Sequence, residues 1–399
     1  MTDPLGQSQV LPYICGLAKS GYAFTLISCE KKHRFENGKS IIEKIAAENN
    51  IDWHPLPYTK NPPVVSTMLD VRKVTKKAKQ LHRDKKFSLV HCRGHIPGLT
   101  GLVLKKKFNV PFLFDMRGFW ADEKKDAGAW RLNNPLYAAI YRYFKAKEKS
   151  FLLYADHTVC LTHRGADELK TWDYLKSINL PLTVIPCCAD IELFNPATVD
   201  ENRRHEIRKG LGITGSDKII SYLGSIGTWY MLDEMLEFFK VFQQSVPPAR
   251  LLFITHDEHE RIRNAGVNKG IDSRCIIIRP TKRAEVPVVL SLSDYSVFFI
   301  RPTYSKISSS PTKQGEIMAM GIPVVCNAGI GDTDLVVNHY HSGVVANSTT
   351  DEAYKKAVSS LLNEKFDKVS IRAGADDYFS LEKGVASYNS IYNSLTHSY

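Results

Sequence analysis

Short apolar runs alternate with longer amphipathic stretches along the first half of the chain. Six runs have the length and composition of buried strands: 22–29, 51–58, 87–92, 111–115, 157–161 and 182–187. Four stretches between them repeat apolar residues at helical spacing: 40–49, 66–83, 98–107 and 135–154. Strands that alternate with helices predict a parallel sheet covered by helices on both faces.

The second half repeats this alternation without a sequence repeat. Its predicted strands are 218–223, 250–255, 275–278, 295–300, 323–326 and 343–345. Its predicted helices are 232–244, 286–292, 312–320 and 351–362. We therefore expect an α/β fold of two doubly wound, Rossmann-like domains facing one cleft. The expected parts are a first domain at 1–194, a second at 195–375, and a final helix at 376–399 that packs back toward the first domain.

The opening of the chain departs from this plan. The sequence T-D-P-L-G-Q-S-Q leads into a helix with no strand ahead of it, although a doubly wound domain ordinarily opens with its central strand. Two interpretations stay open. Either the printed start lies downstream of the true start, with about 5–10 apolar residues ahead of it, or this domain lacks its central strand.

Composition narrows the class of protein. The longest apolar candidate, 10–28, is interrupted by Lys19 and by Gly16 and Gly21, and it lacks the basic start of a signal peptide. The eight cysteines show no C-x-x-C spacing, which disfavours a zinc site or a disulfide framework. We expect a soluble cytoplasmic protein in a reducing compartment.

Positive charge is concentrated in the first half. Up to Asp190 there are 30 basic and 18 acidic residues, a net charge of +12, whereas the remainder carries −1. The basic clusters are Lys76, Lys77, Lys79, Arg83, Lys85 and Lys86, and then Lys105, Lys106 and Lys107. Three interpretations stay open: a nucleic-acid footprint, an anionic membrane surface or phosphorylated lipid, and ordinary solvated helix faces.

The strongest chemical signal lies at 307–331, I-S-S-S-P-T-K-Q-G-E-I-M-A-M-G-I-P-V-V-C-N-A-G-I-G. A helix start at Thr312 offers backbone N–H groups to a phosphate, and Lys313 adds a cation there. Glu316, one turn later, is able to accept hydrogen bonds from ribose hydroxyls. The alternative is an ordinary capped helix followed by a Gly-Pro turn.

This segment resembles the donor-binding signature of glycosyltransferase family 4, retaining enzymes of GT-B architecture. In that family two acidic residues are separated by seven others; the second matches Glu316, and the first falls on Ser308. The S-S-P-T-K-x-G-E version resembles a bacterial subgroup associated with surface polysaccharide. The resemblance makes Glu316 the ribose ligand.

The resemblance continues along the chain in the same order. Gly6, with Gln7 and Gln9, resembles the Gly-rich opening loop that approaches the donor pyrophosphate. The stretch 184–196 resembles the segment before the interdomain linker, and L-G-S-I-G at 223–227 resembles the first loop of the nucleotide domain.

That loop of the nucleotide domain often carries an Arg and a nearby Lys in the family. Here Gly224 and Ser225 are followed by Thr228, Trp229 and Tyr230. We therefore expect the phosphate charge to be met elsewhere. The candidate cations are Lys306 and Lys313, and then Arg301.

Two arginines follow strands of the first domain. Arg117 stands where many relatives have a His, and because Arg stays protonated it is suited to a phosphate or a sugar hydroxyl, not to base catalysis. Its alternative is a structural ion pair with Asp115 or Asp122. Arg93 ends a neighbouring strand, and both arginines are candidates for the acceptor side.

Several patterns are too weak to predict a metal site. Asp332-Thr333-Asp334 spells the D-x-D of another glycosyltransferase architecture, but we expect Asp332 to cap a helix. The pairs His91 and His95, and His157 and His163, have no third ligand at a sensible spacing. We expect no metal requirement.

The resemblance implies a retaining glycosyltransferase that uses a UDP- or GDP-linked sugar and needs no further cofactor. Lys306, Lys313 and the Thr312 amide are expected to hold the diphosphate, with Arg117 assisting. The expected acceptor is a glycan or a lipid diphosphate at the inner membrane face, in cell-surface polysaccharide synthesis. The alternatives are a GT-B sugar-nucleotide epimerase and, from another class, a basic nucleic-acid-binding protein.

Overall fold

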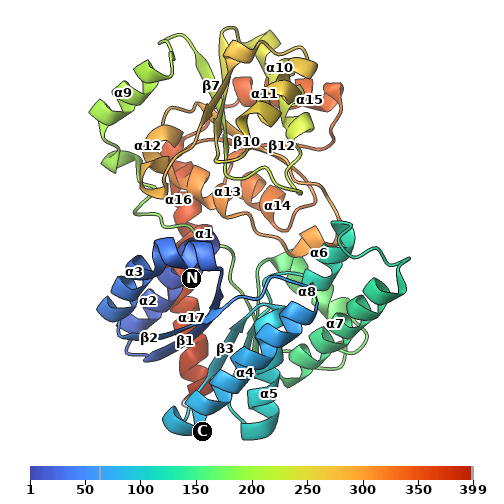
Figure 1. Cartoon of the computed structure of the whole chain (residues 1–399). Coiled ribbons are helices and arrows are strands. Elements are labelled where there is room, and N and C mark those ends of the chain that lie inside the picture. Colours follow the sequence, from blue (N-terminus) through green and yellow to red (C-terminus); the bar gives the residue numbers. More distant parts are fainter. Residues whose placement is uncertain (63, 397–399) are drawn as a thin grey trace. The chain divides into compact units, whose positions relative to one another are not determined.

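A computed structural model describes residues 1–62 and 64–396 of the chain (Figure 1). The chain forms two compact units. The first unit comprises Met1–Pro186 and the chain from Leu381 on, and the second comprises Cys187–Ser380. The division follows Pro186 instead of residue 194, and the last helix begins at Leu381 instead of residue 376. Each unit contains parallel sheets with helices around them, which confirms the predicted Rossmann-like α/β class.

The strands of the first unit are β1 (Phe24–Glu30), β2 (Ile51–Pro57), β3 (Val90–Arg93), β4 (Phe112–Asp115), β5 (His157–Cys160) and β6 (Leu182–Val184). Its helices are α1 (Pro4–Gln9), α2 (Leu11–Lys19), α3 (Lys32–Glu48), α4 (Val65–Lys85), α5 (His95–Phe108), α6 (Trp120–Asp126), α7 (Pro135–Tyr154), α8 (His163–Thr171) and α17 (Leu381–Thr396). Helix α7 has the predicted bounds because Asn134 caps it, accepting from the Leu136 N–H, and Pro135 fits its first position.

The strands of the first unit form two sheets, β1–β2 and β3–β4–β5–β6, and all neighbours are parallel. Figure 1 shows α17, in red, running between β1 and β3. Its Tyr392 ring lies 5.0 Å from that of Tyr22 and 6.1 Å from that of Phe24, and its hydroxyl lies 2.8 Å from His91 Nδ1. Tyr392 therefore joins the two sheets through side-chain contacts.

The second unit has one continuous parallel sheet in the order β12–β11–β10–β7–β8–β9. Its strands are β7 (Lys218–Leu223), β8 (Ala249–Ile254), β9 (Ile276–Arg279), β10 (Tyr295–Phe298), β11 (Val324–Asn327) and β12 (Gly343–Ala346). Its α-helices are α9 (Glu201–Gly210), α10 (Leu232–Ser245), α11 (His259–Asn268), α12 (Val286–Leu290), α13 (Thr312–Ala319), α14 (Thr333–His339), α15 (Asp351–Asn363) and α16 (Lys368–Phe379). Its 3₁₀ turns are η1 (Pro196–Thr198), η2 (Ser273–Cys275), η3 (Arg283–Glu285) and η4 (Tyr304–Ser308).

A single apolar core supports the second unit. Phe253 from β8, Phe239 from α10 and Ile317 from α13 are all fully buried in it. Because α13 packs into this core, the positions of its charged residues are fixed by the same burial that stabilises the unit. Among the helices of residues 1–62 and 64–396, none combines the length and the apolar character needed to cross a bilayer.

Candidate active site

Helix α13 begins where the sequence predicts it, at Thr312. Pro311 occupies the N-cap position and makes no side-chain cap, so side-chain capping does not compete for the first N–H groups of the helix. The preceding residue, Ser310, accepts a hydrogen bond from the Cys187 N–H at 3.1 Å. The loop before the helix is thereby tied to the start of the second unit.

Lys313 is buried between two tyrosine rings. Its Nζ lies 3.5 Å from the ring centre of Tyr230 and 4.0 Å from that of Tyr222, and it donates to the Tyr222 hydroxyl at 2.8 Å. Burial lowers the pKa of Lys313 well below its usual range, against the opposing pull of Glu316 and Asp257. An arriving anion would raise that pKa again.

Lys306 is held in a similar way on the neighbouring aromatic residue. Its Nζ lies 3.8 Å from the centre of the Trp229 ring, and its carbonyl accepts from the Gly331 N–H at 2.8 Å. Trp229 and Tyr230 follow the loop in which relatives often carry cations. Here that segment supplies aromatic faces that hold two lysines from later in the chain.

Glu316 is buried and paired. Its Oε1 accepts from Arg283 Nη1 at 2.7 Å, and the Arg283 guanidinium lies 5.3 Å from the centre of the Phe194 ring. Burial raises the pKa of Glu316, although the charges of Arg283 and Lys313 act in the opposite direction. A carboxylate so placed is able to accept hydroxyl donors, in competition with Arg283.

The loop after β7 already binds a carboxylate. Gly224 has φ +99°, a conformation that favours glycine, and a Cβ there would lie 3.4 Å from Lys313 Nζ. The Ser225 hydroxyl donates to both oxygens of Asp257 at 3.2 Å, and the Ile226 N–H donates to one of them. The loop donors therefore stabilise anionic oxygens, and Lys313 lies beside the same loop at Gly224.

Sequence reasoning missed Arg283 and Asp257. Each follows the carboxyl end of a parallel strand, β9 and β8 respectively, which is where open α/β sheets bind ligands. That position is the signal that could have identified both residues. Arg301, the third candidate cation, is exposed after β10.

In the first unit, the two candidate arginines converge on one buried carboxylate. Arg93 Nη1 lies 3.0 Å from Asp115 Oδ2, Arg117 Nη1 lies 3.8 Å from Asp115 Oδ1, and the Tyr388 hydroxyl donates to Oδ2 at 2.9 Å. Burial opposes the ionisation of Asp115, but Arg117 and Arg93 outweigh it, so the pKa of Asp115 lies well below its usual range. Of the two carboxylates considered for Arg117, Asp115 is its neighbour.

Asp122 has other partners: the Tyr141 hydroxyl at 2.6 Å and Lys145 Nζ at 2.9 Å. Arg117 itself has φ +55°, a left-handed conformation that costs an arginine roughly 1–3 kcal/mol. Strained backbone conformations cluster at functional sites, so the conformation of Arg117 favours a functional role for this residue.

Gly6 and Gln9 lie in α1, not in an open loop. Both are buried, and a Cβ at Gly6 would meet the Met1 backbone at 2.8 Å. The absence of a side chain at Gly6 is therefore explained within the first unit by packing against Met1.

The side chains in the sequence patterns considered for metal binding have protein partners in the structure. Asp332 stands at the N-cap of α14 but makes no capping bond, contrary to expectation; its carboxylate accepts from the Tyr378 hydroxyl at 2.8 Å. His95 Nε2 lies 2.9 Å from Glu148 Oε2, and His157 Nε2 lies 2.9 Å from the Thr183 hydroxyl. Within residues 1–62 and 64–396, no three His, Cys, Asp or Glu side chains gather as a metal site.

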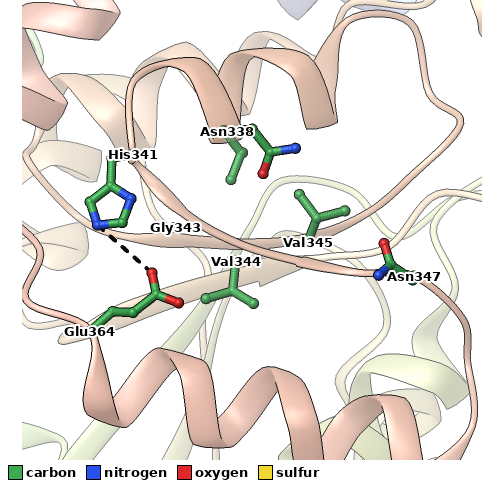
Figure 2. Close-up of a pocket in the computed structure, with 8 residues that line it drawn as sticks. Asn338, His341, Gly343, Val344, Val345, Asn347 and Glu364 are labelled. Carbon is green, nitrogen blue, oxygen red and sulfur yellow. Dashed lines mark ion pairs between the residues drawn. The ribbon is translucent and has the colours of Figure 1, made fainter.

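A separate pocket of about 300 Å³ lies beside β12 (Figure 2). Asn338, His341, Asn347 and Glu364 supply its polar side chains, and His341 Nε2 lies 3.8 Å from Glu364 Oε2. Its lining contains none of the residues predicted for the donor.

Comparisons with known proteins place the two halves of the chain in two glycosyltransferase family models. The family model described as Glycosyltransferase Family 4 matches residues 9–193, and the model described as Glycosyl transferases group 1 matches residues 203–376. No curated protein matches the chain by sequence.

Solved structures resemble the whole chain at low sequence identity. HepE of Anabaena, solved with UDP and glucose, has a TM-score of 0.68 and 12% identity over 99% of this chain and 97% of its own. WaaG, a glycosyltransferase involved in lipopolysaccharide biosynthesis, has a TM-score of 0.65 and 13% identity over 97% and 95%. A putative UDP-N-acetylglucosamine 2-epimerase from Listeria monocytogenes has a TM-score of 0.57 and 12% identity over 98% and 93%.

Proposed function

Because the chain is a glycosyltransferase of the GT-B type, whose first half matches the Glycosyltransferase Family 4 model and whose second half matches the Glycosyl transferases group 1 model, we propose that it transfers a sugar from a nucleoside diphosphate to a glycan or lipid-linked acceptor with retention of configuration. The observation that carries the proposal is the pair of lysines on Trp229 and Tyr230 beside the Gly224 loop and Glu316. HepE was solved with UDP, which supports a uridine donor.

The proposed mechanism is electrostatic. The Thr312 N–H, Lys313 and the loop donors at Ser225 and Ile226 bind the diphosphate, displacing the Asp257 carboxylate. Lys306 adds a second cation. As the sugar–phosphate bond breaks, negative charge grows on the leaving diphosphate, and these positioned donors stabilise it without a metal. Glu316 accepts the ribose hydroxyls after exchanging its bond from Arg283.

On the acceptor side we propose Arg93 and Arg117, oriented by Asp115. Their fixed charge suits a phosphate or hydroxyl of the acceptor. WaaG acts in lipopolysaccharide biosynthesis, which supports a role in cell-surface polysaccharide synthesis.

The test is nucleotide binding followed by product analysis. Thermal stabilisation is compared for UDP, UDP-glucose, GDP, GDP-mannose and ADP, and we expect a uridine or guanosine diphosphate to stabilise the protein most. NMR of the product formed with a glycan acceptor then reports the anomeric configuration. No stabilisation by any nucleotide would refute the proposal. Epimerisation of a UDP-sugar without acceptor would identify an epimerase instead.

We also propose peripheral contact with an anionic membrane surface. The contacts of the basic clusters refine the test: Lys105 pairs with Asp156 at 2.7 Å and Lys106 lies 4.0 Å from the Tyr154 ring centre, so reversing them would disturb the fold. We expect Lys76→Glu with Lys77→Glu to weaken binding to anionic vesicles, since each cation near the surface contributes about 1 kcal/mol. Sugar-nucleotide hydrolysis should survive. Unchanged vesicle binding would leave these lysines as solvated surface.

A further inference from the structure

The outward face of α4 carries apolar side chains first and cations after them. Val65, Met68 and Leu69, in its first turns, have exposed fractions of 50%, 68% and 46%. The cations that follow are Arg72, Lys76, Lys79 and Arg83. At 3.6 residues per turn, all seven positions fall within about 60° of one line along the helix. The helix therefore has one stripe, divided by chemistry along its length.

The start of α7 carries the same kind of side chain. Leu132 and Leu136 have exposed fractions of 41% and 62%. Val64, just before α4, and Tyr137, in the first turn of α7, pack against one small cluster of the first unit. The two helix starts thus flank the same cluster, and both present leucine-sized side chains to solvent.

We propose that the first turns of α4, together with Leu132 and Leu136, insert into an anionic lipid surface as an apolar anchor. The inference rests on the membrane contact proposed above and names the side chains that leave water. Removing such side chains from water is favourable in proportion to their apolar area. The lysines and arginines alone would bind only through charge.

The spacing along α4 fits this partner. Leu69 and Lys76 are separated by about 10 Å along the helix axis, at 1.5 Å per residue. Apolar faces of interfacial helices lie about 5–10 Å into the boundary between headgroups and acyl chains. With the axis inclined to the surface, Arg72 and Lys76 reach the phosphates while the first turns are in the apolar boundary. A nucleic acid would match the cations but not the three apolar side chains.

The experiment compares two matched triple variants of the whole chain on vesicles of phosphatidylglycerol and phosphatidylcholine. One is V65S/M68S/L69S in the first unit. The control is V267S/L335S/V369S, at side chains of the second unit that are 53%, 46% and 76% exposed. We expect the α4 variant to bind vesicles at least about tenfold more weakly than wild type. The control should bind them with unchanged affinity. At about 0.5 M salt, where charge interactions are screened, only the α4 variant should be released completely.

A gain-of-signal variant keeps the inference falsifiable. Tryptophan emission from Met68→Trp, after subtraction of the wild-type signal, should shift to shorter wavelength on these vesicles and be quenched by brominated lipids. An unshifted emission, equal loss in both triple variants, or a dimer of the wild type that V65S/M68S/L69S abolishes would overturn the anchor. UDP binding without vesicles tests the donor proposal separately, because the α4 side chains belong to the other unit.

Discussion

The first strand of each unit is held in a different way. In the second unit, β7 is buried from Ile219 to Leu223 and lies inside a continuous six-stranded sheet. In the first unit, β1 is only half-buried over its first four residues and pairs with β2 in a two-stranded sheet, and among the described residues this sheet does not pair with the β3–β4–β5–β6 sheet on the other side of α17. Side-chain contacts from Tyr392 do in the first unit what backbone pairing does in the second.

This difference separates two ways of holding functional groups. Lys313 and Glu316 stand on a helix whose other face is part of a continuous core, so their positions are set by packing. Arg117 has a strained backbone and pairs with Asp115, and Asp115 in turn accepts a hydrogen bond from Tyr388 of α17. We therefore expect the donor side to tolerate changes in the first unit, and the acceptor side to depend on α17.

The largest expected effect breaks the link within the first unit. Tyr392 is buried, so Tyr392→Ala should destabilise that unit by about 3–5 kcal/mol, as other large-to-small aromatic changes do. Tyr392→Phe, which loses only the hydrogen bond to His91, should cost about 0.5–1.5 kcal/mol. Chemical denaturation measures both. Equal and small losses would mean that α17 does not join the two sheets.

Substitution at Glu316 sharpens the donor side. Glu316→Gln should weaken UDP binding by roughly 1.5–3 kcal/mol, the scale of hydrogen bonds to a charged group. The melting temperature should change little. Glu237→Gln, at a surface residue that pairs with Lys269, is the matched control. If titration calorimetry gave the same UDP affinity for wild type and Glu316→Gln, the ribose assignment would be wrong.

The Arg283–Glu316 pair makes nucleotide binding depend on pH. Burial holds the pKa of Glu316 above its ordinary value, and Arg283 opposes this shift. Only the ionised carboxylate accepts from both ribose hydroxyls, so affinity should fall as pH decreases through that pKa. Removing the cation raises the pKa further, and Arg283→Ala should lose affinity at a higher pH than wild type. Arg274→Ala, at an exposed pair with Asp272, should follow the wild-type profile.

The smallest expected effect concerns Asp257. Since the Asp257 carboxylate occupies the loop donors proposed for phosphate, Asp257→Asn should strengthen UDP binding by roughly 0.5–1 kcal/mol, the upper range for a charge interaction at the protein surface. Asp272→Asn should leave affinity unchanged. Weaker binding by Asp257→Asn would show that this carboxylate supports the loop and does not compete with the ligand.

Local sequence was enough for most elements and for part of the site. The predicted strand at 218–223 and the helix at 135–154 have the observed bounds, because buried β-branched residues and an Asn-Pro helix start carry the signal locally. The pairing of Arg283 with Glu316 joins residues 33 positions apart on different elements, and no local pattern specifies it. The split sheet of the first unit likewise depends on contacts with α17, which comes almost at the end of the chain.

The contacts of Lys306 and Lys313 with aromatic rings could be predicted only in part from the sequence. Trp229 and Tyr230 were visible as a departure from the family pattern, and Lys306 and Lys313 as the replacement cations. Which ring holds which lysine follows only from the fold, since β7 and α13 must be packed before Tyr222 and Tyr230 face Lys313.

Calorimetric titration of UDP into wild type and Lys313→Met, in pairs of buffers of different ionisation enthalpy at several pH values between neutrality and the ordinary pKa of lysine, tests the central claim most directly. Burial lowers the pKa of Lys313, and a bound diphosphate should raise it, so wild type should take up protons on binding. Lys313→Met should bind UDP more weakly by about 1.5–3 kcal/mol and without proton uptake. Equal affinity and equal proton uptake in the two proteins would contradict a diphosphate site at Lys313.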